Sequence, residues 1–228
     1  MARYLLALGD RAYSSWSLRG WLLFEKFGLT AEYRFGRLYD PAFGEMLAEF
    51  APAETVPALK IDDLVIWDSL AIAEELATRH PGAGHWPADP RARAMARTLA
   101  AAMHSGFGAL RDYCPMNLRV SFADCSPPDA VLRDVARLTD LWARARADFG
   151  GDGPWLCGAY SVADAFFAPV AARIAGYNLP IDEAGAEYVF AHLTEPCFRD
   201  WRAQSLTDGP DQPFYARDWP LRDWPAPV

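Results

Sequence analysis

The sequence predicts a small α/β domain followed by an all-helical domain. Short apolar runs typical of strands alternate with helical patterns at the start of the chain, and only helical periods follow from Asp89 onward. A segment rich in proline and glycine separates the two patterns. We therefore expect an α/β domain at residues 1–81, a linker at 82–90, a helical domain at 91–206 and an extended tail at 207–228.

The elements of the first domain follow from the residues that begin and end each run. Residues 4–8 are continuously apolar and end in Gly9–Asp10, as in a buried strand followed by a turn. Ser14 and Gly28 delimit the first helical pattern. The other expected elements are a strand at 31–38, a short helix at 41–50, a hairpin of strands 56–61 and 64–67, and a helix that begins at Asp68–Ser69 and ends at Arg79–His80.

Apolar residues at helical spacing predict the second domain. One such stripe consists of Val131, Val135, Leu138, Trp142, Ala145 and Phe149. A further helix begins at Ser161, where Asp164 completes a start that resembles a capping box, so we expect Asp164 to be buried and structural. The tail from Gly209 is rich in proline and aromatic residues, which predicts a non-helical segment that packs along the body of the protein.

Composition and charge exclude several classes of partner. The chain has 228 residues, of which 52% are hydrophobic, enough for a globular core. Its net charge of −8, with arginines spread along the chain, argues against nucleic acid and anionic lipid as partners. The four cysteines share no C-x-x-C spacing, so neither a disulfide framework nor a metal site is indicated. No apolar run approaches the roughly 20 residues that span a bilayer, and we expect a cytoplasmic location.

Three features of the first domain could bind a small, anionic or peptide-like ligand. Residues 14–17, Ser-Ser-Trp-Ser, lie at a helix start, where free amides favour anions and a hydroxyl could donate to a thiolate. A cis Val56–Pro57 bond, which the sequence cannot determine, would turn the valine backbone outward to pair with a ligand. Asp68–Ser69 opens the next helix. Simple helix caps and a strand-entry proline are the alternatives.

In their order and spacing these features resemble the glutathione transferase superfamily. The resemblance covers residues 3 to about 205, and it includes Trp86–Pro87 in the linker and a capping motif at Gly158–Asp164. It implies a thioredoxin-like α/β N-terminal domain, which binds glutathione, and an all-α C-terminal domain. It also implies a two-fold homodimer.

The segment Ser14–Arg19 is most similar to the zeta class, whose signature reads Ser-Ser-Cys-x-x-Arg. This implies that Ser14 activates the glutathione sulfur, with Ser15 as the second choice. Glutathione, as co-substrate, would be bound by Ser14, Ser15, Trp16, Thr55, Val56, Pro57, Asp68 and Ser69. The pocket for the second substrate would contain Trp16, Asn117, Arg119 and Arg173. For Asn117 and Arg119, a helix break at Pro115 with two solvated polar residues is an equal alternative.

The chain departs from the zeta pattern at three places. Trp16 stands where zeta enzymes have cysteine, and Thr55 replaces the usual polar or basic residue before Val-Pro. The arginine that zeta isomerases use for a substrate carboxylate would fall near Gly176, and Arg173 lies about one turn earlier. These departures weaken maleylacetoacetate isomerase as the specific activity.

The leading hypothesis is a glutathione transferase in which Ser14 stabilises the thiolate for attack on an electrophilic substrate. One alternative is a glutathione-dependent cis–trans isomerase of the maleylacetoacetate type, and another is a non-catalytic glutathione-binding module. A disulfide reductase is disfavoured because no cysteine lies near the first helix.

Overall fold

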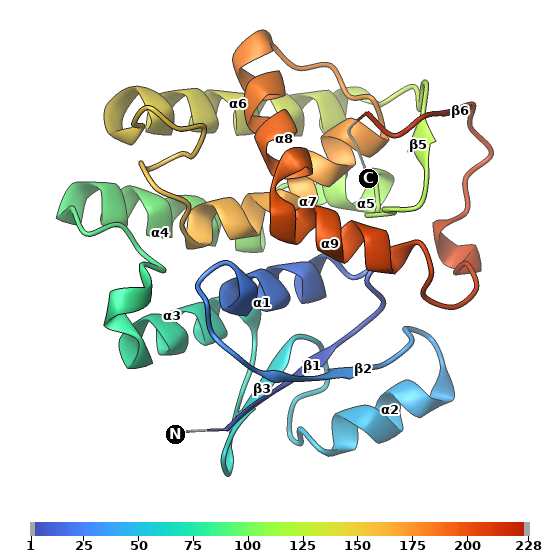
Figure 1. The fold of residues 1–228 in the computed structure, drawn as a ribbon. Helices are drawn as coiled ribbons and strands as arrows, with labels where there is room; N and C mark the ends of the chain where they lie inside the picture. The colour runs from blue at the N-terminus through green and yellow to red at the C-terminus, as the bar shows by residue number, and fades with distance from the viewer. Residues whose placement is uncertain (1–2, 226–228) are drawn as a thin grey trace.

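The computed structural model describes residues 3–225 and shows a small sheet-containing part packed against a larger helical part (Figure 1). The first part consists of β1 (Tyr4–Leu8), α1 (Ser15–Glu25), β2 (Glu32–Phe35), α2 (Pro41–Ala48), β3 (Ala58–Ile61), β4 (Leu64–Ile66), α3 (Ser69–Arg79) and the 3₁₀ turn η1 (Pro81–Ala83). The helical part consists of α4 (Pro90–Ser105), α5 (Gly108–Tyr113), β5 (Ser121–Phe122), α6 (Asp129–Phe149), α7 (Val162–Gly176), α8 (Glu183–Thr194) and α9 (Pro196–Ser205). The tail contains η2 (Pro213–Tyr215) and β6 (Leu221–Arg222).

The four strands of the first part form a mixed sheet in the order β2-β1-β3-β4. β1 pairs parallel with β2 and antiparallel with β3, so a βαβ unit is followed by an antiparallel hairpin and a helix. Strand alternation sends Leu6 and Leu8 into the main core and Ala7 to the opposite face, where Leu47 of α2 covers it. The predicted fold class, a thioredoxin-like domain followed by a helical one, is confirmed.

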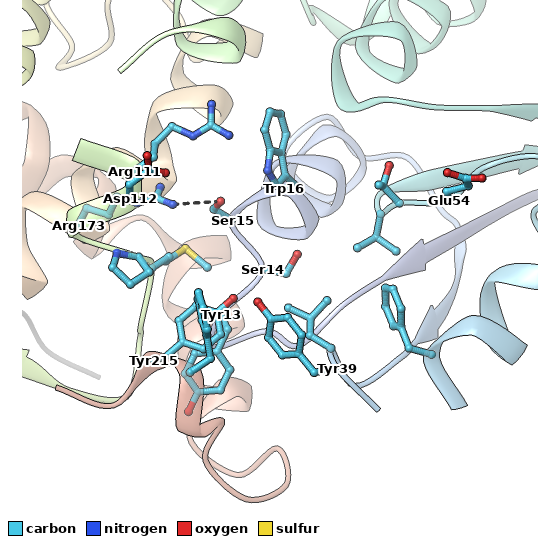
Figure 2. Close-up of a pocket in the computed structure, with 17 residues that line it drawn as sticks. Tyr13, Ser14, Ser15, Trp16, Tyr39, Glu54, Arg111, Asp112, Arg173 and Tyr215 are labelled. Carbon is cyan, nitrogen blue, oxygen red and sulfur yellow. Dashed lines mark hydrogen bonds between the residues drawn. The ribbon is translucent and has the colours of Figure 1, made fainter. Parts of the chain in front are cut away.

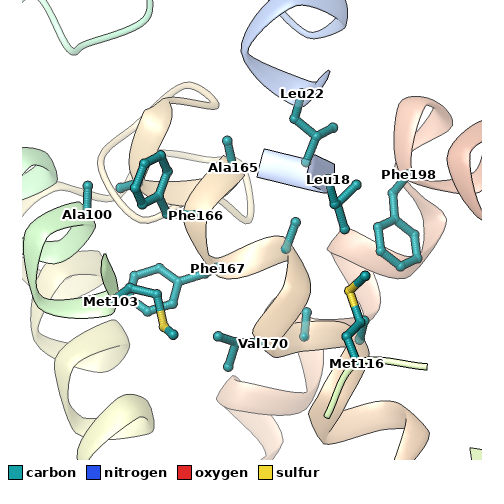
Figure 3. Packing of buried hydrophobic residues seen from close by; sticks show 14 of the residues in the cluster. Leu18, Leu22, Ala100, Met103, Met116, Ala165, Phe166, Phe167, Val170 and Phe198 are labelled. Atoms are coloured by element: carbon teal, nitrogen blue, oxygen red, sulfur yellow. The ribbon is translucent and has the colours of Figure 1, made fainter. Parts of the chain in front are cut away.

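Helix α7 is the centre of the helical part, and all of its residues are buried. It contacts α4, α8 and also α1 of the first part. Figure 3 shows Leu18 and Leu22 of α1 beside Ala165 of α7, with Phe198 of α9 close by. Because α1 packs on the sheet with one face and on α7 with another, its N-terminus is held where the two parts meet.

The start of α7 is closed by its own side chains, as the sequence predicts. Asp164 is fully buried, and its Oδ2 accepts from the Ser161 backbone N–H at 2.9 Å and from the Ser161 hydroxyl at 3.1 Å. Its Oδ1 accepts from the Leu156 backbone N–H at 3.1 Å and from the Tyr188 hydroxyl at 2.9 Å. The expectation that Asp164 is buried and bound by the Ser161 region is confirmed.

The end of the helical part and the tail add detail to the expected elements. Residues 183–205, whose pattern looks helical but less regular, form two helices, α8 and α9, and the second begins at Pro196, because proline lacks the N–H that would continue the first. The tail packs along the body as expected, but it is not simply extended: it contains the turn η2, and β6 pairs with β5. The pairing of β6 depends on contact with a distant strand, which no local pattern shows. None of the helices within residues 3–225 is long and apolar enough to cross a bilayer.

Candidate active site

A pocket of about 530 Å³ lies at the N-terminus of α1, between the two parts of the protein (Figure 2). Its walls come from the start of α1, the loop after β2, the loop before β3, the α5 region with α7, and the tail. The lining residues are Tyr13, Ser14, Ser15, Trp16, Leu38, Tyr39, Phe43, Glu54, Thr55, Val56, Arg111, Asp112, Pro115, Met116, Arg173, Phe214 and Tyr215. The volume falls in the usual range for small-molecule sites.

Ser14 is both a helix cap and a pocket residue. Its Oγ accepts from the backbone N–H of Ser17 at 3.2 Å, which makes it the N-cap of α1. The Ser14 and Ser17 hydroxyls lie 2.7 Å apart, and the Ser17 Oγ also accepts from the Gly9 backbone N–H at 2.7 Å. Only 6% of Ser14 is exposed, and Figure 2 shows it near the centre of the pocket. Ser14 is therefore an N-cap, as the alternative predicts, and its hydroxyl also lies beside the pocket.

The pair of hydroxyls can supply a proton to the pocket. Hydroxyl groups both donate and accept, so the contact between Ser14 and Ser17 can run in either direction. When Ser17 donates to Ser14, the proton of Ser14 is free to point at an anion in the pocket. The first turn of α1 contains no acidic residue that would offset the partial positive charge of this helix end. This arrangement suits a bound thiolate.

The wall across from the start of α1 offers free backbone groups. Figure 2 shows Glu54 on the side of the pocket away from the arginines, and Thr55 and Val56 follow it along this wall. The Val56–Pro57 peptide bond is cis, and the ladder between β1 and β3 ends at Ala58, so the backbone of Val56 lies outside it. An extended peptide-like ligand can pair there.

Pro57 does not line the pocket but packs behind it against α1. A Cβ at Gly20 would lie 2.7 Å from the Pro57 Cβ, so only glycine lets the helix come this close. Pro57 therefore contributes to the spacing between α1 and the loop that carries Val56.

Asp68 and Ser69 also lie outside the residues that line this pocket. The Oδ1 of Asp68 accepts from the Leu70 backbone N–H at 3.0 Å, which makes it the N-cap of α3, and its Oδ2 lies 3.1 Å from Nε2 of His104. Ser69 is fully buried, and its hydroxyl has no partner within the described part of the chain. The role of the two residues in holding glutathione stays a prediction.

Two arginines form a cationic wall. Arg173 of α7 is 5% exposed and donates to the Cys114 carbonyl at 2.9 Å and to the Ser15 hydroxyl at 3.2 Å, the bond drawn in Figure 2. Burial, with a smaller effect of Arg111, lowers the pKa of Arg173 to about 10, so it stays charged at neutral pH. Within residues 3–225, neither Arg111 nor Arg173 forms an ion pair. Two unpaired cations beside a pocket favour an anionic ligand.

Trp16, which stands at the position of the zeta-class cysteine, lies between two guanidinium groups. The guanidinium carbons of Arg19 and Arg111 lie 4.6 and 4.8 Å from its ring centroid. Arg19 is 1% exposed, and burial first, then Arg173 and Arg111, lowers its pKa well below the ordinary value. The indole thus covers a buried charge next to the pocket.

Asn117 and Arg119 are not among the residues that line this pocket, and their role in a second-substrate site stays a prediction. Arg119 instead binds the tail: it donates to the carbonyls of Ser205, Asp208 and Gly209 and to the carboxylate of Asp211. The Oδ1 of Asn117 accepts from the Arg119 backbone N–H at 3.0 Å. The guanidinium of Arg119 thus donates to acceptors of the tail and of the end of α9, and it lies away from the pocket.

Sequence reasoning missed other residues of the pocket. Arg111 belongs to the six-residue helix α5, which carries no motif. Tyr39, Phe214 and Tyr215 reach the pocket from the β2–α2 loop and from the tail. The only sequence signal for the tail residues was the high content of aromatic side chains in the tail. Such a content indicates that the tail packs on the protein, but it does not show which surface the tail covers.

Comparison with known proteins shows what the sheet-containing part and this site are similar to. Residues 13–79 match the family model described as "Glutathione S-transferase, N-terminal domain". The match covers most of the sheet-containing part and does not extend into the helical part. The matched residues include the start of α1, the Val56–Pro57 bond and Asp68–Ser69, the three features from which the resemblance was inferred.

Two solved structures that are similar to this one share its fold over about nine-tenths of the chain. A glutathione transferase homolog from Burkholderia GL BGR1, with bound glutathione, is 23% identical with a TM-score of 0.66 and covers 89% of this chain and 97% of its own. A maleylacetoacetate isomerase from Anaeromyxobacter dehalogenans 2CP-1, with bound glutathione, is 24% identical with a TM-score of 0.65 and covers 92% of this chain and 99% of its own.

Curated relatives match over a shorter stretch. A probable maleylacetoacetate isomerase of Caenorhabditis elegans is 34% identical over 102 residues, which is 45% of this chain and 47% of the relative. The maleylacetoacetate isomerase of Rattus norvegicus is 39% identical over 70 residues, 31% of this chain and 32% of the relative. The chain thus matches a third to a half of the length of these relatives.

Proposed function

We propose that this protein is a glutathione transferase in which Ser14 stabilises the glutathione thiolate for attack on an electrophilic substrate. The observation that carries the proposal is the position of Ser14: its hydroxyl lies at the open N-terminus of α1 and beside the pocket, with the backbone of Val56 on the other wall. The bound glutathione in two similar structures supports it. Ser15, Trp16, Thr55, Val56, Pro57, Asp68 and Ser69 are the other proposed glutathione residues.

The chemistry needs little from the protein beyond charge stabilisation and positioning. A hydrogen bond from Ser14 and the dipole of α1 favour the thiolate over the thiol and so lower the pKa of the glutathione sulfur. In the structure the Ser14 hydroxyl donates to the Ser17 hydroxyl; with a thiolate bound, this bond would reverse, so that Ser17 donates to Ser14 and the Ser14 proton points at the sulfur. The thiolate then forms a bond to an electrophilic carbon, and the displaced group leaves with the electron pair.

The isomerase alternative is favoured by one specific observation, the unpaired cations Arg111 and Arg173 on the pocket wall. They suit a substrate with a carboxylate, and the curated relatives are named as maleylacetoacetate isomerases. In that reaction the thiolate adds to a conjugated double bond, the carbon–carbon bond rotates, and the thiolate leaves. An isomerase assay with a maleyl substrate, run beside a conjugation assay, distinguishes the two activities.

A titration with glutathione and a conjugation assay test the main proposal together. We expect glutathione to bind and to react with 1-chloro-2,4-dinitrobenzene at a rate that saturates with glutathione. No binding of glutathione at millimolar concentration would contradict the proposal, and binding without turnover on any electrophile would favour a non-catalytic module.

We further propose a cytoplasmic homodimer. The four free cysteines, three of them buried, are compatible with a reducing compartment. Leu64 lies in the edge strand β4 and Trp67 directly follows it. Both are large apolar side chains, 46% and 43% exposed, that a second subunit could cover. Light scattering at micromolar concentration tests the dimer, and a monomeric mass would contradict it.

A further inference from the structure

A second cavity lies beside the segment that joins the two parts of the protein. This linker cavity has a volume of about 550 Å³ and is bounded by the second half of α3, residues 80–88, the first half of α4 and the loop before α7. None of the described residues that line it is shared with the pocket at the start of α1. Figure 1 shows α3 and α4 on the side of the molecule opposite the tail, whose residues line the other pocket.

His85 lines the linker cavity and keeps one ring nitrogen without a partner. It is 2% exposed, and its Nε2 lies 3.0 Å from the carbonyl of Leu23 in α1. Because a carbonyl can only accept, Nε2 carries the proton. Burial lowers the pKa of His85 below its ordinary value, so the ring is neutral at neutral pH and Nδ1 is an acceptor. Nδ1 has no hydrogen-bond partner within residues 3–225.

The neighbouring residue, Trp86, provides a buried donor. Its indole N–H has no hydrogen-bond partner in the part of the chain that the structure describes. The guanidinium carbon of Arg97 lies 5.4 Å from the ring centroid. Buried polar groups are usually hydrogen-bonded, and each one that is not reduces stability. A donor and an acceptor without partners, on adjacent residues that line one cavity, indicate a site for a polar molecule.

Arg93 gives the linker cavity an excess of positive charge. Its Nη1 donates to the carbonyls of Pro87 and Ala88 at 3.2 and 2.8 Å, which attaches the guanidinium to the linker. Arg93 forms no ion pair within residues 3–225, whereas Arg97 of the same wall pairs with Glu74 at 3.0 Å. A local cation of this kind favours an anionic ligand even on an acidic protein.

Aromatic side chains reach the cavity from two segments. Trp86 belongs to the linker, and Tyr160 belongs to the loop before α7. Contacts hold the Tyr160 ring in place: the Trp155 ring centroid lies 4.7 Å from its own, and Nζ of Lys26 lies 4.7 Å from it. The volume is in the usual range for small-molecule sites, and fixed rings beside a few polar groups are typical of their lining.

We propose that the linker cavity is a second ligand site, which binds a small aromatic carboxylate that also carries a hydrogen-bond donor. The carboxylate pairs with Arg93, and the donor binds Nδ1 of His85. The ring of the ligand lies against Trp86 and Tyr160, and the indole N–H of Trp86 donates to an oxygen of the ligand. The inference goes beyond the proposed function and does not depend on it.

A titration followed by NMR with ¹⁵N-labelled tryptophan tests the site. The chain has nine tryptophans, and Trp86→Phe identifies the indole N–H signal of Trp86. The signal of Trp16 reports on the other pocket, which Trp16 lines. We expect 4-hydroxyphenylacetate to shift the Trp86 signal with a Kd of about 1 mM, as for other ligands of this size.

Two related ligands test the polar contacts without any variant. Phenylacetate lacks the hydroxyl donor and should bind about fivefold more weakly at Trp86. The compound 4-hydroxyphenylacetamide lacks the charge and should bind about tenfold more weakly. His85→Gln places an amide N–H where Nε2 lies and removes the acceptor Nδ1, so this variant should bind 4-hydroxyphenylacetate and phenylacetate equally.

Arg93→Gln should weaken 4-hydroxyphenylacetate at Trp86 by about tenfold, because the glutamine side chain is uncharged. Arg91→Gln is the matched control. Arg91 lies two residues earlier on α4, is exposed and is not among the residues that line the linker cavity. It should leave the affinity within about twofold of the parent value.

Three results would overturn the linker site. One is an unchanged Trp86 signal at about ten times the expected Kd, which would mean that the two buried polar atoms bind water only. Another is a response of Trp16 alone, which would assign the acid to the other pocket. The third is equal binding of 4-hydroxyphenylacetate and phenylacetate by the parent, or an equal effect of the two arginine variants. Glutathione should leave the Trp86 signal unchanged, and its failure to bind would contradict the proposed function only.

Discussion

The N-termini of α1 and α7 are two serine-capped helix starts with opposite environments. Asp164 closes α7: its carboxylate accepts hydrogen bonds from Leu156, Ser161 and Tyr188 and is fully buried. The first turn of α1 has no acid, and its cap Ser14 lies beside a pocket. The two helices pack against each other, so they share one region of the molecule. The difference between their N-termini therefore comes from the residues that cap them and not from their location in the fold.

This difference separates a structural helix start from a binding one. An N-terminus whose donors and partial positive charge are satisfied within the chain has nothing left for a ligand. An N-terminus without its own acid, placed at a pocket, can stabilise an external anion. The same residue type, serine, therefore contributes to stability at one helix and to chemistry at the other.

Ser14→Ala should produce the largest effect. We expect kcat for conjugation to fall by about 10²-fold or more, because one donor to a developing anion is lost, while glutathione affinity changes little. The pH–rate profile should also shift to higher pH, since the glutathione thiol loses the bond that lowers its pKa. Steady-state kinetics and a glutathione titration measure these effects. Unchanged kinetics would transfer the role to Ser15.

The pH dependence of stability should report on Asp164. Burial, opposed by its hydrogen bonds, raises the pKa of this carboxyl from 3.8 to about 6 in the folded protein. The folded state then favours the protonated carboxyl. The contribution of this protonation to the stability of the fold is complete below pH 3.8 and is lost as the pH rises through 6. A shift of this size corresponds to roughly 3 kcal/mol.

Unfolding measured from pH 4 to 8 for the parent and for Asp164→Asn tests this dependence. The stability of the parent relative to the variant should decline across the window, because asparagine does not titrate. Parallel curves would show that the pKa of Asp164 is not raised.

Asp164→Ala should destabilise the protein by about 1–3 kcal/mol, because the donors of Leu156, Ser161 and Tyr188 lose their acceptor. Surviving soluble protein should bind glutathione with near-normal affinity. Thermal unfolding and kinetics on the same sample distinguish a structural role of Asp164 from a catalytic one. A normal melting temperature with abolished turnover would make Asp164 a general base and remove the contrast between the two helix starts.

Ser161→Ala should produce the smallest effect and is the counterpart of Ser14→Ala. We expect a loss of about 1 kcal/mol in stability, as for other N-caps, with kinetic constants equal to those of the parent. Thermal melts and the conjugation assay on both serine variants complete the comparison. A fall in kcat like that of Ser14→Ala would mean that any loosened helix start impairs the site.

The sequence by itself determined the elements and the helix caps, because these depend on residues close along the chain. Serine at Ser14 and Ser161 and the acid at Asp164 identify helix starts through local hydrogen bonds. The continuous apolar run at residues 4–8, which ends at Gly9–Asp10, identifies a buried strand. From such signals the fold class and the residues at the start of α1 could be predicted.

Only the tertiary structure decided which distant residues share the pocket. Arg119 was expected at the pocket but binds the tail, whereas Arg111 and Phe214, which no motif marks, line it. The route of the tail depends on hydrogen bonds and ring contacts between residues far apart in the chain, such as Gln212 with Leu38 and Tyr13 with Tyr215. Such contacts join residues that are far apart in the chain and depend on how the helices pack, so the local periodicity of the sequence does not predict them.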